Sequence, residues 1–78
     1  MEKTTTKKFG KYLVTLELFE EDGEQRSYCD IENTSTNASG SSGMAQDLGY
    51  LEKSNGLEED ISNGVLDKIY DWAIDNGY

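Results

Sequence analysis

The segment KYLVTLELF, residues 11–19, is rich in β-branched and aromatic side chains and predicts a β-strand. Glu20 and Glu21 follow, and then Asp22-Gly23. Asp-Gly is a strong signal for a two-residue hairpin turn, because a type I′ turn needs a positive φ at both central positions. The sequence therefore predicts an antiparallel hairpin that turns at residues 22–23.

The pattern of apolar and polar positions also predicts the register of this hairpin. With Asp22 and Gly23 in the turn, facing residues have numbers that sum to 45. One face then pairs Val14 with Ile31, Leu16 with Cys29 and Leu18 with Ser27. The other face pairs Thr15 with Asp30, Glu17 with Tyr28 and Phe19 with Arg26. A slip of one residue would destroy this separation into an apolar and a mostly polar face.

The C-terminal segment has the spacing of an amphipathic helix. Its apolar stripe comprises Val65, Leu66, Ile69, Trp72 and Ala73. Asn76-Gly77 is suited to cap the C-terminus of this helix. Asn63-Gly64 leaves two interpretations open, in which residues 57–76 form either one bent helix or two helices. A further short helix is predicted over residues 44–53.

Length and composition favour one folded domain over residues 1–78. A chain of this size buries only roughly 60 % of the surface that its unfolded form exposes. Residues 1–10 are expected to form a flexible basic leader, and residues 34–43, TSTNASGSSG, a flexible polar loop. The predicted fold class is α+β: an N-terminal antiparallel hairpin, with or without a further strand, packs against one to three short helices, the C-terminal one being the longest.

The net charge of −9 is distributed unevenly. Residues 1–16 hold four of the seven basic side chains but only one of the sixteen carboxylates. The rest of the chain is therefore strongly anionic, and nucleic-acid phosphates and anionic lipids would repel it. Long-range attraction would instead speed its encounter with a basic protein surface, which we expect its partner to carry.

Missing residue types exclude most catalytic and metal-binding arrangements. The chain has no histidine and one cysteine, so it lacks the residues for Ser-His-Asp catalysis, Cys-His catalysis and finger-type zinc sites. No window follows the order of an EF-hand, and no Gly-Lys-Ser/Thr ending marks a phosphate-binding loop. We therefore expect no enzyme activity, no cofactor and no metal. Cys29 is interpreted as a small apolar residue inside a strand, with a disulfide-linked dimer as the alternative.

Two acidic groups and one ring are the candidate partner-binding residues. The hairpin turn contributes Glu20, Glu21, Asp22 and Glu24, followed by the exposed ring of Tyr28. The C-terminal segment contributes Asp60, Asp67, Asp71 and Asp75. Their spacing of seven, four and four residues places these aspartates along one ridge of a continuous helix. For both groups the alternative is structural: a solvated helix face, and a turn whose charges discourage edge-to-edge association of sheets.

In its small size, acidity, lack of catalytic groups and hairpin-plus-acidic-helix plan, the chain resembles phage-encoded anti-CRISPR proteins and other DNA-mimic inhibitors. This resemblance implies that carboxylates occupy a basic, nucleic-acid-binding surface of a CRISPR surveillance complex or another host defence nuclease. An adaptor or self-associating module that adds a strand at the hairpin edge is a second hypothesis. A carboxylate-dependent hydrolase is a third.

The expected location is the cytoplasm, that of the host cell if a phage encodes the protein. No apolar run approaches the roughly 18 residues that span a bilayer, and MEKTTTKKFG lacks the apolar segment of a signal peptide. We expect a monomer or a homodimer that contacts neither membrane nor nucleic acid directly.

Overall fold

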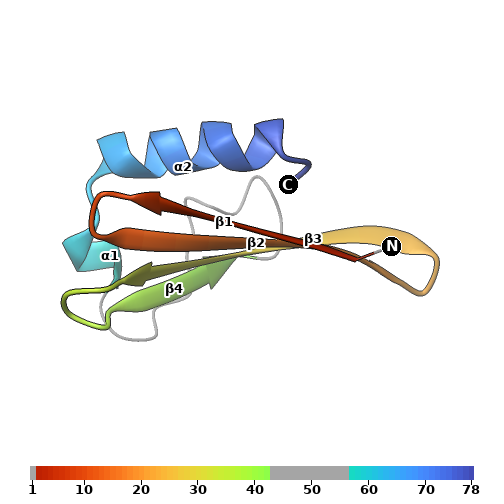
Figure 1. The fold of residues 1–78 in the computed structure, drawn as a ribbon, viewed down its shortest axis with the longest axis horizontal. Helices are drawn as coiled ribbons and strands as arrows, with labels where there is room; N and C mark the ends of the chain where they lie inside the picture. Colours follow the sequence, from red (N-terminus) through yellow and green to blue (C-terminus); the bar gives the residue numbers. More distant parts are fainter. Residues whose placement is uncertain (1, 43–56) are drawn as a thin grey trace.

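The described part of the protein, residues 2–42 and 57–78 of a computed structural model, is an antiparallel sheet with helices beside it. Its elements are β1 (Lys3–Phe9), β2 (Tyr12–Glu21), β3 (Glu24–Asn33), β4 (Ser39–Ser42), α1 (Leu57–Asp60) and α2 (Asn63–Asp75). The strands lie in the order β1-β2-β3-β4, and α2 runs along the sheet (Figure 1). The predicted α+β class is confirmed, with α2 the longer of the described helices.

The central hairpin has the predicted turn and the predicted register. Asp22 and Gly23 have φ angles of 54° and 79°, as a type I′ turn requires. Strands β2 and β3 pair from Tyr12↔Asn33 to Glu21↔Glu24, and every pair keeps the sum derived from the sequence. The turn and the separation into two faces therefore agree on one register.

The expectation of a flexible leader over residues 1–10 is wrong, because Lys3–Phe9 forms strand β1 and pairs with β2 along its whole length. Gly10, at φ 64°, sits in the two-residue turn between these strands. Three consecutive threonines, β-branched and suited to extended backbone, outweigh the polar and charged character of the segment. Its lysines lie on an edge strand, where charge discourages the addition of further strands.

The interpretation of residues 34–43 as a flexible loop is also wrong for its described part. After a turn in which Asn37 has a φ of 63°, Ser39–Ser42 pairs with β3 as strand β4. The Asn33 N–H donates to the Ala38 carbonyl at 2.7 Å, and the Asn37 N–H donates to the Asn33 carbonyl at 2.8 Å. Backbone bonds to β3 thus stabilise a strand of low β propensity. The helix expected over 44–53 lies outside the described residues.

The apolar face of the hairpin forms the core together with the helices. Its buried residues are Tyr12, Val14, Leu16, Cys29, Ile31, Ala38, Leu57, Ile61, Ile69 and Ala73. Helix α2 contributes Ile69 and Ala73, both fully buried, so the predicted helical stripe faces the sheet. The rings of Phe9 and Trp72 meet edge to face with centroids 5.7 Å apart, which joins β1 to α2.

Two helices, and not one bent helix, occupy the described part of residues 57–76. Helix α1 ends at Asp60, and α2 begins after Ser62, whose hydroxyl accepts a hydrogen bond from the Val65 N–H at 3.3 Å. At the other end, Gly77 has a φ of 101° and donates to the Ile74 carbonyl at 3.1 Å. The Tyr78 N–H donates to the Ala73 carbonyl, which completes a Schellman cap and confirms the predicted C-terminus.

Replacement of a core-face leucine should cost far more stability than replacement of a leucine on the other face. Leu16 is fully buried and Leu13 is half-buried on the opposite face of the same strand. We expect Leu16→Ala to lower the free energy of unfolding by about 2–5 kcal/mol, and Leu13→Ala by clearly less. Urea denaturation measures both, and equal losses would contradict the assignment of the two faces.

Candidate protein-binding surface

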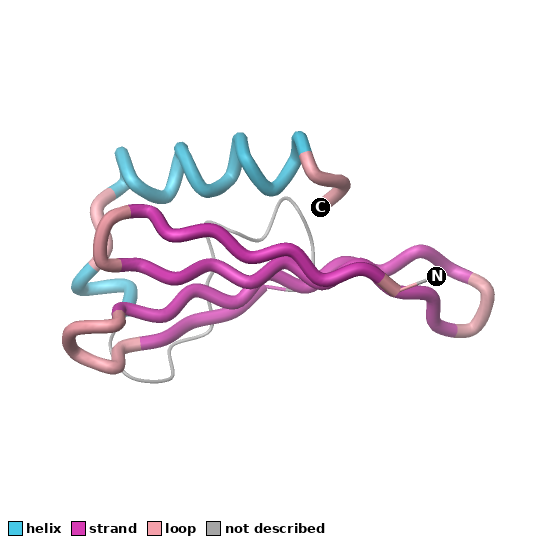
Figure 2. Tube along the Cα trace, in the orientation of Figure 1, coloured by secondary structure: helices cyan, strands magenta, loops and turns pink. Residues whose placement is uncertain are grey.

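The β2–β3 hairpin extends beyond both of the strands that flank it. Among the residues that the structure describes, β1 pairs with β2 as far as Leu18, and β4 pairs with β3 as far as Cys29. Residues 19–28 therefore form a two-stranded ribbon, here called the hairpin arm. Figure 2 shows this arm projecting from one end of the molecule, along the longest dimension of 36 Å.

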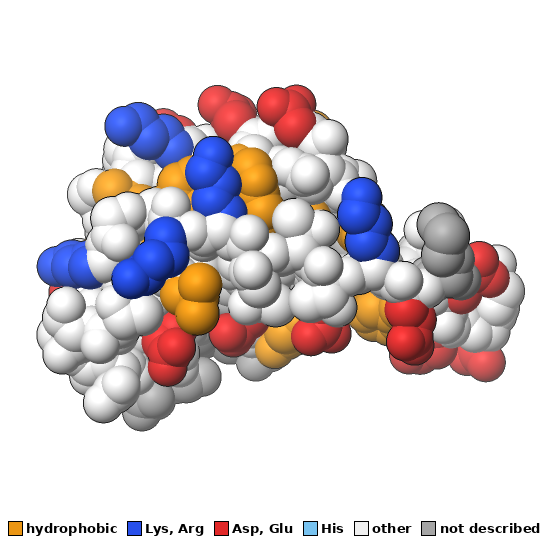
Figure 3. All heavy atoms as spheres, viewed as in Figure 1, with side chains coloured by type: hydrophobic (Ala, Val, Ile, Leu, Met, Phe, Trp, Pro, Cys, Tyr) orange, Lys and Arg blue, Asp and Glu red, His pale blue; other side chains and the backbone are white. Residues whose placement is uncertain are grey.

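The arm carries all the candidate residues that were predicted around the hairpin turn. Glu20, Glu21, Asp22 and Glu24 are exposed, and Tyr28 is 39 % exposed. Figure 3 shows acidic side chains gathered at this end of the molecule. Arg26 faces Phe19 in the register, and its Nη2 atom lies 3.1 Å from Oε2 of Glu24. The arm is thus a projecting, mainly acidic element with a partly exposed ring at its base.

The sheet face opposite the core, here called the polar face, carries further carboxylates. The register places Glu17, Asp30 and Glu32 on this face together with Phe19 and Tyr28. Burial raises the pKa of Asp30, and repulsion from Glu32 and then from Glu17 raises it further. Asp30 is therefore close enough to both glutamates for their charges to repel its own.

Sequence reasoning did not single out Glu17, Asp30 and Glu32, although the register contained the signal. It pairs Glu17 with Tyr28 and Thr15 with Asp30, so Glu17 and Asp30 are diagonal neighbours across the two strands. Asp30 and Glu32, two residues apart on β3, share a face. The acidic surface therefore continues from the hairpin arm along the polar face.

The helical aspartates lie elsewhere. Asp67, Asp71 and Asp75 are exposed on α2, and Figure 3 shows acidic side chains along the outer side of this helix. Because α2 packs on the core face, this ridge is on the opposite side of the sheet from the polar face. The predicted continuous ridge from Asp60 to Asp75 is wrong, since Asp60 ends α1 and the other three belong to α2.

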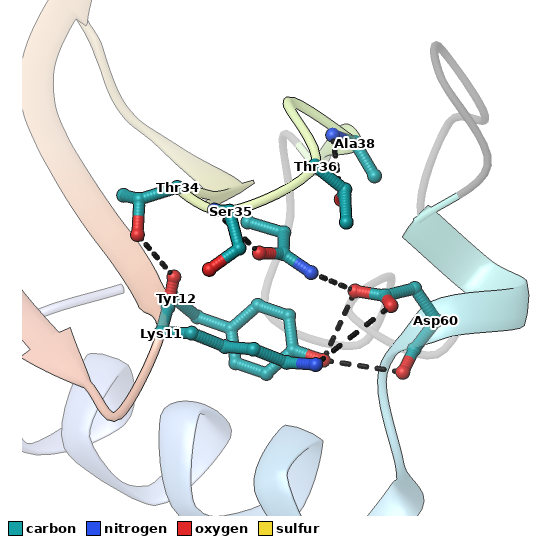
Figure 4. A network of polar contacts seen from close by, with 8 residues as sticks. Lys11, Tyr12, Thr34, Ser35, Thr36, Ala38 and Asp60 are labelled. Atoms are coloured by element: carbon teal, nitrogen blue, oxygen red, sulfur yellow. Dashed lines mark hydrogen bonds and ion pairs between the residues drawn. The ribbon is translucent and has the colours of Figure 1, made fainter.

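The Asp60 carboxylate is instead the centre of a polar network (Figure 4). The Tyr12 hydroxyl lies 3.1 Å from both the backbone carbonyl and Oδ2 of Asp60, and Nδ2 of Asn33 donates to the same Oδ2. Nζ of Lys11 lies 4.0 Å from Oδ1. The hydrogen bond from Asn33 is the main cause that lowers the pKa of Asp60, with Tyr12 and Lys11 adding to it against partial desolvation.

The same network closes the end of the sheet away from the hairpin arm. Oδ1 of Asn33 accepts a hydrogen bond from the Ser35 N–H at 2.9 Å, and the N–H and hydroxyl of Thr34 both donate to the Lys11 carbonyl. Turn β3–β4, turn β1–β2 and α1 are thereby joined. Asp60 has a structural role here, so we leave it out of the proposed binding surface.

Cys29 is fully buried in the core, as expected for a small apolar residue in a strand. Burial, with a smaller contribution from the charge of Asp30, raises the pKa of its thiol to about 12. The thiol is inaccessible, and very little of it is in the reactive thiolate form at neutral pH. Both properties disfavour the alternative of a disulfide-linked dimer.

Within residues 2–42 and 57–78, no group of three or more histidine, cysteine, aspartate or glutamate residues has a geometry that could hold a metal ion. None of the helices described is long and apolar enough to cross a membrane.

Comparisons with protein-family models, curated proteins and solved structures found no match to this chain. The resemblance to anti-CRISPR proteins therefore stays a prediction from size, charge and plan.

Removal of the Asp60 charge should change how stability depends on pH. Because the folded protein lowers the pKa of Asp60, its ionised form adds stability above about pH 4, and this stability is lost as the pH falls through the folded pKa. We expect Asp60→Asn to be less stable than the parent at pH 7, with a gap that narrows under acid conditions. Thermal unfolding from pH 2 to 7 measures this.

The matched control is Asp67→Asn, an identical change at an exposed helical site. It should alter stability by no more than about 0.5 kcal/mol. An equal loss in both variants would show that the Asp60 network has no special structural role.

Asp30→Asn should have the opposite effect at pH 7. The raised pKa of Asp30 means that its ionised form is disfavoured in the folded state, so the stability linked to its proton is present at low pH and lost as the pH rises through the folded pKa. We expect Asp30→Asn to stabilise the protein at pH 7. This stabilisation should be smaller in high salt, because salt screens the repulsion that the substitution removes. A lower melting temperature at pH 7 would contradict this.

Proposed function

We propose that this protein is a non-enzymatic inhibitor that binds a basic surface of a nucleic-acid-binding protein and so excludes DNA or RNA from it. The proposed target is a CRISPR surveillance complex or another host defence nuclease. The observation that carries the proposal is the hairpin arm, on which four exposed carboxylates project from the body of the protein. Projection lets these charges enter a groove that a flat acidic face would not reach.

Charge density indicates that attraction alone does not explain such an inhibitor. The arm holds four carboxylates and one guanidinium over roughly 15 Å of ribbon, or about one net negative charge per 5 Å. Duplex DNA carries one per roughly 1.7 Å of axis. The arm therefore needs packed contacts as well as charge to compete with DNA, and the rings of Tyr28 and Phe19 on the adjoining face provide area for them.

The repulsion among Glu17, Asp30 and Glu32 also supports a binding role for the polar face. Burial first, and then the charges of Glu32 and Glu17, disfavour the ionised form of Asp30 in the folded protein and raise its pKa. Binding to a cationic surface would relieve this repulsion. The electrostatic free energy that is unfavourable for folding would then contribute to the affinity for the partner. Perturbed titratable groups gather at functional sites for this kind of reason.

The structure bears on the alternative of strand addition at the hairpin edge. Strands β1 and β4 already pair with the two edges of the hairpin, except along the arm. Strand addition to the hairpin itself is thus restricted to residues 19–28, whose acidic side chains would repel a second copy. We therefore favour a basic partner over self-association, and we place the encounter in the host cytoplasm.

Charge reversal separates the arm from the helical ridge as the binding surface. The parent protein first captures its partner from lysate of its native host, and affinity is then measured for two triple variants. We expect Glu20→Lys/Glu21→Lys/Glu24→Lys to weaken binding by roughly 10- to 100-fold, because three rim attractions become repulsions.

The matched control is Asp67→Lys/Asp71→Lys/Asp75→Lys, which changes the net charge by the same amount on the other side of the sheet. It should weaken binding far less than the arm variant. Equal losses of affinity in the two variants would show that the attraction comes from the overall charge of the protein. Capture of a partner with no basic nucleic-acid-binding surface would overturn the proposed function.

A further inference from the structure

A hollow of about 260 Å³ opens at the base of the hairpin arm, where β1 begins beside β2. Its lining consists of Glu2, Thr4, Glu17, Leu18 and Phe19. Thr4 and Glu17 face each other across β1 and β2 on the polar face, and Phe19 lies two residues further along the same face. The hollow thus joins the polar face to the arm.

The chemistry of the lining fits a cation with a flat, partly apolar surface. Glu2 and Glu17 supply carboxylates, Thr4 a hydroxyl, and Phe19 an aromatic ring. An aromatic face attracts a cation, and guanidinium stacks on such rings while it donates parallel hydrogen bonds to a carboxylate. The chain's one arginine, Arg26, pairs with Phe19 in the register, but its guanidinium lies against Glu24.

The size of the hollow favours a single side chain over a free ligand. Pockets that bind small molecules usually measure about 300–1,000 Å³ and enclose most of the ligand. A volume of about 260 Å³ at the surface is below that range. One long cationic side chain, inserted from a partner, matches this volume and charge.

We propose that this hollow is an anchor site for one arginine side chain of the basic partner. The guanidinium stacks on the Phe19 ring and bonds to the Glu17 carboxylate, beside Thr4 on the same face. This inference rests on the proposed function, which supplies a basic partner, and it adds the packed contact that the charge density of the arm requires. Arginine is favoured over lysine because an ammonium neither stacks nor bonds in parallel pairs.

Titration of the isotope-labelled full chain with N-acetyl-arginine methylamide, followed by NMR, tests the anchor. We expect saturable shifts at the backbone amides of Thr4, Leu18 and Phe19. N-acetyl-lysine methylamide should bind at least about threefold more weakly, since it lacks stacking and paired hydrogen bonds. Equal binding of the two probes, or no saturable shift at these amides, would overturn the proposal.

Isosteric variants identify the carboxylate that matters. Glu17→Gln should raise the dissociation constant of the arginine probe about three- to fivefold, the effect expected of one partly exposed ion pair. Glu20→Gln, which follows Phe19 in the chain but lies outside the lining of the hollow, should change it less than twofold. Equal effects of both variants would show that the arm attracts the probe non-specifically, and would overturn the proposed anchor site.

Phe19→Leu keeps both carboxylates and removes the ring, and we expect a loss similar to that of Glu17→Gln. Unchanged amide shifts in α2 verify that this variant folds. Because the titration needs no partner, it fails or succeeds independently of partner capture. Capture of a basic partner with no arginine binding would overturn the anchor alone, and arginine binding with no basic partner would overturn the proposed function alone.

Discussion

The pairing of β2 with β3 through the Asp22-Gly23 turn is the constraint on which the other features depend. It commits Val14, Leu16, Cys29 and Ile31 to one face, and helix α2 has a surface to cover only because these side chains lie together. By the same parity, Glu17, Asp30 and Glu32 must share the other face. Core formation and the concentration of negative charge are therefore consequences of one register.

The two ends of the sheet are used differently. At one end, the network around Asp60 and Asn33 joins α1 to both neighbouring turns, and its polar groups are satisfied within the protein. At the other end, the hairpin arm extends past β1 and β4, and its charged side chains are exposed. Stability thus comes mainly from the core and the closed end, which leaves the arm free to carry charges that a more compact arrangement would not accept.

The sequence predicted the elements in which local signals and face separation agree, namely the hairpin with its register and the capped C-terminal helix. It failed for β1 and β4, because Lys-Thr and Ser-Gly segments have weak patterns of their own and are strands only through pairing with β2 and β3. The role of Asp60 was missed for the same reason, since its partners Tyr12 and Asn33 are 48 and 27 residues away. The acidic side chains of the hairpin turn could be placed together from the sequence because they are close neighbours in it.

In the proposed mechanism, the protein and a nucleic acid compete for one basic surface. The most direct measurement is the dissociation constant of the captured partner for its DNA or RNA at increasing concentrations of this protein. Competition predicts an apparent dissociation constant that rises linearly and without limit. A constant that levels off, or does not change when the protein is saturating, would show that both bind at once, which competition for one surface excludes.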